Sequence, residues 1–568
     1  MSDGAATKLQ FRVLYRQFLF RMVDLEVLSA SALGDTNKLL GQFAALLVLF
    51  SVVSGLEPLF MDKNITPHAL SELTVQTEHM LITVTMVVIG IFAVLSWDSV
   101  FPDRRDVFVL APLPVRARTM FLAKVASTAT ALGLVVVLLH CGAGLTWPFV
   151  FSVRRAGFVG LMRSFAAYWF TMLAAGAFIY CGVLAIQGLT AQILPRKLFL
   201  RVSGFLQMAA FCLFVSVYFL EPAVDWFQAL LGQLNGSMPP TLAPLARRAW
   251  LGLAATALAA AAAYALSYMR IIRQIVEQPD ITSARRSFRW LPRFGDAVQT
   301  AIGQFSVRTL ARSRQHRLIL AFYLGVGLAF TIPLLSLLAT SQPPDAPVIN
   351  VWHRPNAPLL AANVMMMALA VLGLRVVFAF PLELRANWIF RAVGLRDGGK
   401  ILIASRRALL LLSVAPVWVI SAAVCFWLWP WQQAAAHLAV LGLLGIILAD
   451  VALFGFRKIP FTCSYLPGKS QVHMIIVAAV ILISLVAQSV TWEQEALQKP
   501  GMMAAMLALL GLAAVAIRWR IAVLARSDEE GLQFEEEGTP AVLELGLYRD
   551  GVVIGTRPRD GKNQSRER

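Results

Sequence analysis

The sequence has little charge for its length. Of its 568 residues, 14% are charged and 58% are hydrophobic, and the mean hydropathy is +0.69. Soluble proteins carry about 25% charged and roughly 45–50% apolar residues, so this chain could not give several soluble domains a polar surface. The same shortage of polar residues excludes a disordered, collagen-like or small disulfide-linked protein. The composition predicts an all-α polytopic membrane protein.

Cysteines and known catalytic or metal-binding patterns are also scarce. Four of the five cysteines lie in apolar segments and one in a basic loop, without a CxxC pair, which argues against disulfides and zinc. No Ser/His/Asp set, HExxH motif or carboxylate pair is evident, so we expect no catalytic residue, no metal site and no enzyme activity in this chain. Two partial phosphate-loop patterns, at 394–400 and 463–470, each lack a required residue. The polar N-terminal segment does not resemble a cleaved signal peptide.

Long apolar runs are what the sequence has in abundance. A helix needs about 20 apolar residues to cross the hydrocarbon core of a bilayer. Twelve runs meet this requirement, at 39–61, 78–98, 119–142, 165–192, 202–220, 249–269, 318–339, 358–380, 408–430, 437–456, 473–491 and 502–524. The connections on the outer side are short, the longest being 221–248. The sequence therefore predicts about twelve transmembrane helices.

The positive charge lies on one side of these predicted spans. With the N-terminus inside, 41 of the 50 Lys and Arg residues fall in cytoplasmic segments, eight in outer loops and Arg375 within a span. Cytoplasmic loops of membrane proteins retain Lys and Arg, so this distribution predicts that both termini are cytoplasmic. It also explains the net charge of +18 without nucleic acid as a partner.

The spans divide into two sets of six with the same order of features. The basic stretch 108–124 follows the second span, and a similar stretch, 390–406, follows the eighth, 282 residues later. Amphipathic basic segments at 12–28 and 301–318 precede the two sets. We therefore predict an N-terminal interfacial segment (1–38), two six-span repeats that lie parallel in the membrane (39–270 and 318–526), a cytoplasmic linker with a second interfacial helix (271–317) and a cytoplasmic tail (527–568).

The tail differs in composition from the rest of the chain. Two short alternating runs, VLELGLY and GVVIGT, flank Arg549-Asp550-Gly551. An Asp-Gly pair between such runs is typical of a tight hairpin turn. The sequence therefore predicts a small β-hairpin.

Few ionisable side chains fall inside the predicted spans. Such residues are costly in a bilayer and are candidates for a translocation path. The alternatives are that they lie near an interface, that Arg375 extends to the headgroups, or that Asp450 pairs with Arg457 or Lys458. The candidates are Glu57, His140, Arg375 and Asp450.

The loop after the second span combines helix-breaking prolines with an exposed apolar group. The apolar residues 108–113 lie between pairs of arginines. A solvated loop does not need an apolar centre, whereas a helix that docks in the groove of a partner protein does. An amphipathic helix lying on anionic lipid would show the same pattern. Both interpretations remain open from the residues alone.

The stretch LPVRARTMFLAKVAS, which follows the charged turn FPDRRD, resembles the permease subunits of type-2 ABC exporters. The resemblance implies an amphipathic helix on the inner membrane face at 12–28 and a coupling helix at 108–124 that contacts a separate ATPase. The second-half loop reads GLRDGGK and departs from the family pattern, and the twelve-span chain would be a fused, double-length form. The coupling residues that the resemblance indicates in the two loops are Phe108, Leu113, Pro114, Arg116, Arg118, Lys124, Phe390, Leu395 and Arg406.

A permease of this kind would form the transport path of an exporter in the bacterial inner membrane. The resemblance implies that ATP and magnesium bind to a partner ATPase, in two copies, and that this chain binds no cofactor. Membrane lipids are the other expected partners. One alternative is a secondary transporter of the major facilitator kind, of whose loop motif Asp103-Arg104-Arg105 would be a fragment. A second alternative is a membrane-embedded enzyme or scaffold that acts on lipid.

Overall fold

The computed structural model of the protein describes residues 3–23, 36–56, 66–97, 113, 115–152, 157–194, 196–217, 220–237, 239–277, 293, 295–340, 351–380, 398–454, 456, 458–462, 472–527, 544–548 and 551–555. Almost all of these residues are helical. The helices before residue 280 are α1 (Asp3–Val23), α3 (Thr36–Leu56), α4 (Pro67–Leu95), α7 (Ala117–His140), α8 (Ala143–Ser152), α9 (Phe158–Ile193), α10 (Arg196–Ser216), α11 (Glu221–Asn235), η3 (Pro240–Leu242) and α12 (Ala243–Glu277).

The later part of the chain is also helical up to residue 527. Its helices are α13 (Ala297–Arg312), α14 (Arg314–Thr340), η4 (Val351–His353), α15 (Ala357–Phe378), α17 (Gly398–Leu409), the π-helical turn η6 (Leu410–Val414), α18 (Ala415–Leu428), α19 (Trp431–Ala452), α20 (Val472–Ala496) and α21 (Pro500–Ser527). In the tail, β1 (Glu544–Tyr548) pairs antiparallel with β2 (Gly551–Gly555), at the place where the sequence predicts a hairpin.

The structure is that of an all-α polytopic membrane protein, as the composition predicts. Within the described residues, nine helices are long and apolar enough to cross a membrane, or ten if α10 and α11 together form one bent span. Helices α3 and α20 lie where two further spans are predicted, but their described residues do not establish them as spans. The count of twelve therefore stays a prediction.

The segment after residue 216 differs from the predicted arrangement. The predicted span 202–220 and the predicted outer connection 221–248 correspond to two helices: α10 ends at Ser216, and α11 begins at Glu221 at an angle of 59° to it. Pro222 stands in the first turn of α11, where its missing N–H is tolerated, but it could not continue α10. Val224, Phe227 and Leu231 recur at helical spacing and are buried. This apolar face explains why the predicted loop is a helix.

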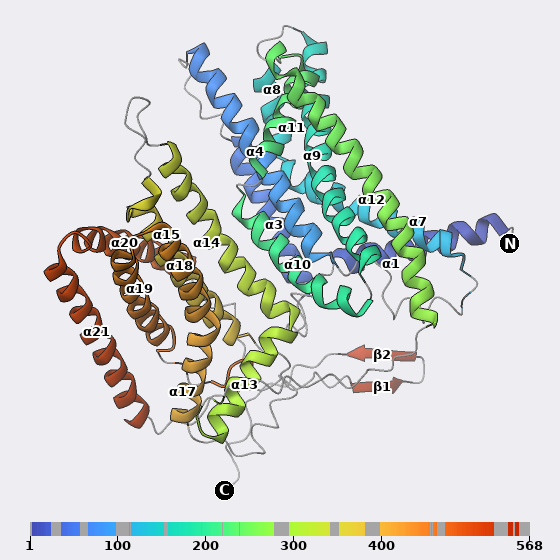
Figure 1. Ribbon diagram of the computed structural model, residues 1–568. Helices are drawn as coiled ribbons and strands as arrows, with labels where there is room; N and C mark the ends of the chain where they lie inside the picture. Colours follow the sequence, from blue (N-terminus) through green and yellow to red (C-terminus); the bar gives the residue numbers. More distant parts are fainter. Residues whose placement is uncertain are drawn as a thin grey trace.

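The helices form two groups, each around its own hydrophobic core (Figure 1). The first core contains buried residues between Leu14 and Ala321, and the second contains buried residues between Leu310 and Val490. Helix α14 joins the two groups, because it packs on α10 of the first and on α15 of the second. The approach of α10 and α14 is close: a Cβ at Gly325 would lie 2.8 Å from the Val215 side chain.

The same kinds of helix pairs contact each other in both groups. Helix α1 packs on α7 as α13 packs on α17, and α4 packs on α9 as α15 packs on α19. Helix α9 also packs on α12 as α19 packs on α21. The first predicted span of each set differs, since α3 packs on α7 and α8 whereas α14 packs along α15.

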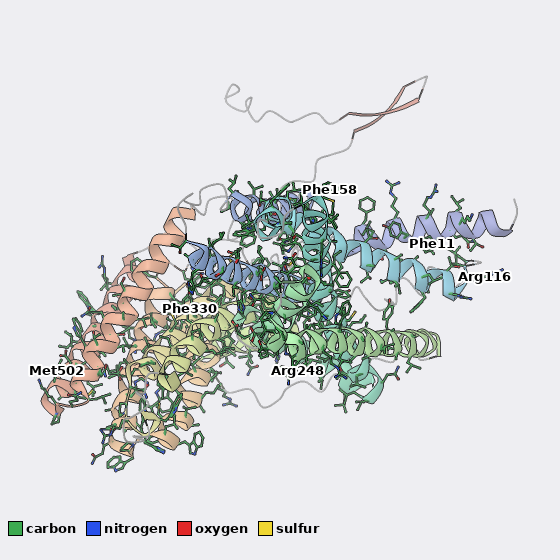
Figure 2. All side chains as sticks on the ribbon, turned by 90° about the horizontal axis from the view of Figure 1, so that it is seen from above. Phe11, Arg116, Phe158, Arg248, Phe330 and Met502 are labelled. Carbon is green, nitrogen blue, oxygen red and sulfur yellow. The ribbon has the colours of Figure 1, made fainter. Side chains whose placement is uncertain are left out.

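The exposed apolar surface is consistent with a lipid environment. In the most apolar stretch of α15, 67% of the stretch is buried inside the protein. The corresponding stretches of α12 and α21 are only 17% and 6% buried. Helix α21, which carries Met502, lies at the edge of the molecule in both views, away from α1 and α7 (Figures 1 and 2). On α21, Leu512 and Trp519 are each 70% exposed. A soluble protein rarely exposes so continuous an apolar surface.

Two glycines allow α3 to approach the turn between α7 and α8. The Ser51 Oγ accepts hydrogen bonds from the N–H groups of Gly142 (2.8 Å) and Ala143 (3.2 Å). A Cβ added at Gly55 would lie 2.7 Å from the Gly142 carbonyl carbon, and a Cβ at Gly142 would lie 2.7 Å from the Ser51 carbonyl oxygen. Because the opposing atoms belong to the backbone, neither contact can be relieved by a side-chain rotation.

We expect Gly55→Ala to lower the free energy of unfolding by ~1–3 kcal/mol, the usual cost of overpacking a core. Gly511→Ala is a matched control, since Gly511 is also helical but no atom lies within 4 Å of its added Cβ. Alanine stabilises an unobstructed helix by ~0.5–1 kcal/mol, so this control should be neutral or more stable. Unfolding of both variants in one detergent measures the difference. Equal stabilities would contradict the close approach.

Candidate functional site

Three of the predicted coupling residues of the first half, Leu113, Arg116 and Arg118, lie around the start of α7. The Leu113 side chain is 49% exposed. The carbonyl oxygen of Leu113 accepts a hydrogen bond of 2.6 Å from the N–H of Val115. Arg116 follows as the N-cap of α7, and both Arg116 and Arg118 are exposed. Phe108 and Pro114 lie outside the described residues. The structure therefore brings one apolar and two basic exposed side chains together at this end of α7.

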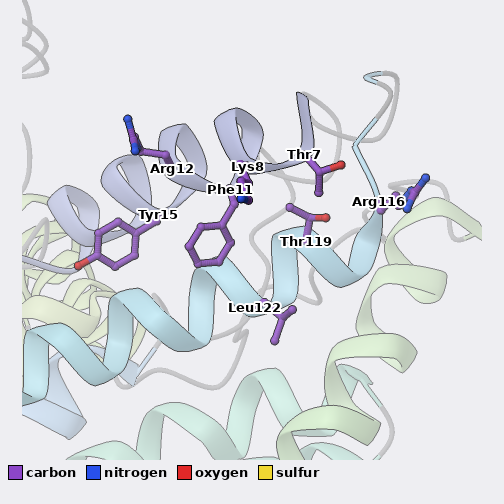
Figure 3. A pocket seen from close by; sticks show the side chains of 8 residues that line it. All are labelled: Thr7, Lys8, Phe11, Arg12, Tyr15, Arg116, Thr119 and Leu122. Atoms are coloured by element: carbon purple, nitrogen blue, oxygen red, sulfur yellow. The ribbon is translucent and has the colours of Figure 1, made fainter. Parts of the chain in front are cut away.

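Lys124, in contrast, is buried within the first helix group. Its side chain is 4% exposed, and Nζ lies 4.7 Å from the centre of the Phe18 ring. The Tyr15 hydroxyl donates to Thr130 Oγ1 over 3.0 Å in the next turns of α7. These two contacts attach α1 to α7, and the labelled Tyr15 lies between these two helices in Figure 3. Lys124 therefore fixes α1 and is not part of the exposed surface.

Arg406, the predicted counterpart of Lys124, also makes an internal contact. Its guanidinium forms a bidentate ion pair with Asp450 of α19, in which Nη2 lies 3.1 Å from Oδ2 and Nε contacts Oδ1. Asp450 thus pairs with Arg406, because α17 packs beside the end of α19. Of the two partners considered from the sequence, Arg457 lies outside the described residues. Phe390 and Leu395, the other predicted residues of this loop, lie outside the described residues.

Helix α17 is also held to α13 by polar contacts. Lys400 Nζ lies 3.8 Å from Asp296 Oδ2, and Arg407 Nη1 donates to Gln299 Oε1 over 2.9 Å. Asp296 is the N-cap of α13, and its Oδ1 accepts from the Gln299 N–H over 2.8 Å. Helices α13 and α17 are therefore fixed to each other, as α1 is fixed to α7.

Of the four candidates for a translocation path, the three that the structure describes do not come together. Glu57 lies outside the described residues. Arg375 donates to the carbonyl oxygen of Ala452 over 2.7 Å and lies 4.5 Å from the centre of the Phe456 ring. Arg375 and Asp450 therefore make internal contacts around the same end of α19, whereas His140 is at the end of α7 in the other helix group. The structure does not place these residues along one path.

His140 is the centre of a buried hydrogen-bond network in the first group. Its Nε2 lies 2.8 Å from Thr85 Oγ1 of α4, and its Nδ1 lies 2.7 Å from the Tyr168 hydroxyl of α9. The Thr85 hydroxyl donates its hydrogen to the Leu81 carbonyl oxygen, so Thr85 Oγ1 accepts a hydrogen bond from Nε2 of His140. Because a neutral imidazole has one N–H, Nδ1 is then the acceptor, and the Tyr168 hydroxyl donates to it. The network joins α4, α7 and α9 and is complete with a neutral imidazole.

A second buried histidine, which the sequence interpretation missed, has a different environment. His437 of α19 and Glu493 of α20 are both 0% exposed, and Nδ1 of His437 lies 2.6 Å from Oε1 of Glu493. Asn363 of α15 lies 3.1 Å from the other ring nitrogen, Nε2. Among the described residues, Oε2 of Glu493 has no hydrogen-bond partner. The second group therefore contains a carboxylate and an imidazole in contact inside the helix bundle.

The hydrogen-bond directions in this second network follow from Ser421. The Ser421 hydroxyl donates to Asn363 Oδ1 over 3.1 Å, which places the Asn363 amide nitrogen toward His437 Nε2. Nε2 therefore accepts, and the ring hydrogen is on Nδ1, where it is donated to Glu493. The chain Ser421–Asn363–His437–Glu493 joins α18, α15, α19 and α20.

A metal site is not evident in the part of the chain that the structure describes: no group of three His, Cys, Asp or Glu residues is arranged to bind an ion there. Comparison with models of protein families, with curated proteins and with solved structures finds no match.

Proposed function

We propose that the chain is the permease subunit of an ATP-driven exporter and forms the transmembrane path for a partner ATPase. The observation that supports this most is the pairing of α1 with α7, which presents Leu113, Arg116 and Arg118 at one exposed end. The equivalent pairing of α13 with α17 supports two parallel repeats and two ATPase copies on one chain. In this proposal, that end faces the cytoplasm of a bacterial inner membrane, with both chain termini on the same side.

The contacts within each half suggest how force would reach the path. An ATPase that closes on ATP would press on the start of α7, and α1 would move with α7 because Lys124 and Tyr15 attach the two helices. In the second half, the ion pair of Arg406 with Asp450 would transmit motion from α17 to α19. Because the two groups have separate cores and meet along α10 and α14, a path between them would open there.

We expect the triple variant Leu113→Ala, Arg116→Ala, Arg118→Ala to bind its ATPase at least ~30-fold more weakly, since interface anchors contribute about 2 kcal/mol or more. Gentle solubilisation, followed by quantification of the co-purifying ATPase, measures this. Arg247→Ala, Arg248→Ala, Leu251→Ala is the matched control, because these three residues of α12 are also exposed. A wild-type protein that retains no ATPase would contradict the proposal.

A second candidate function, a proton-coupled secondary transporter, is favoured by the His437–Glu493 contact. Proton-coupled transport uses ionisable groups inside the bundle, and this pair is the kind of group required. One assay separates the two functions. Vesicles containing the protein and its ATPase are supplied with ATP without a proton gradient, or with a gradient without ATP. Transport under the first condition alone supports the permease, and transport under the second alone supports the secondary transporter.

A further inference from the structure

A cavity of about 810 Å³ lies between α1 and the first turns of α7 (Figure 3). The two helices run in the same direction: Thr7 and Arg116 lie at one end of the close-up, and Tyr15 lies at the other. Beyond the cavity the helices are held together by Tyr15 and Lys124. The volume is within the ~300–1,000 Å³ typical of sites for small organic ligands.

The lining of the cavity is basic at its edge and apolar between the helices. Lys8, Arg12 and Arg116 are among the eight lining residues, and none of the eight is acidic. Phe11 points from α1 toward α7, and Leu122 of α7 adds a second apolar side chain (Figure 3). Helix α7 begins beside the cavity without an acidic residue in its first turn, so the positive end of its dipole is not neutralised there. This combination attracts an anion that also carries an apolar portion.

The outer surface of α1 indicates that this anion belongs to a membrane. Leu14 and Phe18 are buried, whereas Leu9, Val13 and Phe20 on another face are 55%, 59% and 61% exposed. Lys8, Arg12 and Arg16 recur every four residues between these two faces, and the Arg16 guanidinium lies 5.5 Å from the Phe20 ring centre. An exposed apolar face beside a basic stripe is typical of a helix at the membrane surface.

We propose that the cavity between α1 and α7 binds an anionic phospholipid. The positive charge of Lys8, Arg12 and Arg116 would attract the anionic headgroup to the edge of the cavity, and an acyl chain would lie against Phe11 and Leu122. A free phosphate shares the charge but would leave the apolar side chains uncovered, so the lipid is the better match. The site is on the same helix pair as the proposed ATPase surface, but it does not depend on the ATPase.

The test uses the full-length protein purified in a neutral detergent and analysed intact by native mass spectrometry. Phosphatidylglycerol, phosphatidylcholine and inorganic phosphate are added separately. We expect phosphatidylglycerol to bind, and the variant Lys8→Gln, Arg12→Gln to bind it ~30-fold more weakly, since each basic residue contributes about 1 kcal/mol at an anionic surface. Both residues are exposed, so the substitutions leave the core intact. Arg247→Gln, Arg248→Gln is the charge-matched control and should bind like the wild type.

Three outcomes would overturn the proposal. Equal binding of phosphatidylcholine and phosphatidylglycerol would show that the cavity does not select an anion. If inorganic phosphate protected the protein against thermal unfolding as much as phosphatidylglycerol does, the cavity would be a site for the free ion. Equal losses in the α1 variant and the α12 control would mean that lipid binds by overall charge and not at this cavity.

Discussion

His437→Ala is expected to lower the free energy of unfolding by about 3–5 kcal/mol, the usual result of removing one partner of a buried ion pair or charge-assisted hydrogen bond. His437 Nδ1 donates a hydrogen bond to Oε1 of Glu493, and both side chains are fully buried. Without the imidazole, both carboxylate oxygens of Glu493 would be buried without a partner, and Asn363 would lose the acceptor for its amide hydrogen. Chemical or thermal unfolding in a single detergent measures the effect.

The surface histidine His68 provides the control, because it is exposed at the start of α4. His68→Ala should change stability by less than ~0.5 kcal/mol, as is usual for surface sites. The double variant His437→Leu, Glu493→Leu should recover much of the loss, since it replaces both buried polar partners with apolar groups of similar size. If His437→Ala is as stable as the wild type, the two side chains do not form the buried pair.

The sequence could predict the class of the fold because the bilayer imposes a simple length requirement. Runs of about 20 apolar residues predict helices at the right places, and α4, α9, α15 and α19 are found there. The hairpin lies at its predicted position, and α13 lies close to the segment 301–318 that is predicted to be a second interfacial helix. The hydropathy does not predict the change of direction between α10 and α11, since the sequence of the two helices reads as one apolar run followed by a loop.

Part of the candidate site was hidden by the positions of helix ends. The apolar runs place His437 at the first residue of the predicted span 437–456. They place Glu493 just outside the predicted span 473–491. Helix α20 in fact continues to Ala496, and α19 begins six residues before His437. Boundaries predicted from sequence carry errors of this size. The sequence signal for this site is a pair of ionisable residues within one turn of the ends of two consecutive predicted spans, because such residues become buried when the helices extend beyond those ends.

The partners of charged residues were harder to predict, because they depend on which helices meet. Lys124 and Arg406 occupy similar places in the two repeated stretches, and the same surface role was predicted for both. The Lys124 ammonium lies over an aromatic ring of α1, whereas Arg406 pairs with a carboxylate 44 residues away. Sequence spacing contains no information on contacts between helices that are this far apart in the chain.

The second large effect is expected at this Arg406–Asp450 pair, and its size should depend on which partner is removed. The Asp450 side chain is 3% exposed and that of Arg406 is 21% exposed. Arg406→Leu leaves a buried carboxylate without its partner, so we expect a loss of about 3–5 kcal/mol. Asp450→Asn leaves a guanidinium that can still extend toward the surface, so this variant should lose only about 1–3 kcal/mol.

Unfolding of both variants in the same detergent tests this order, with Arg407→Leu as the neighbouring control. Arg407 is exposed and donates a hydrogen bond to the neutral Gln299 side chain, so its replacement should cost no more than ~1 kcal/mol. Arg406→Lys should lie between the wild type and Arg406→Leu, because lysine keeps the charge but cannot form the bidentate contact. If Arg407→Leu costs as much as Arg406→Leu, the effect comes from loss of positive charge along α17. A larger loss in Asp450→Asn than in Arg406→Leu would mean that the guanidinium is the more deeply buried partner, opposite to the arrangement in the structure.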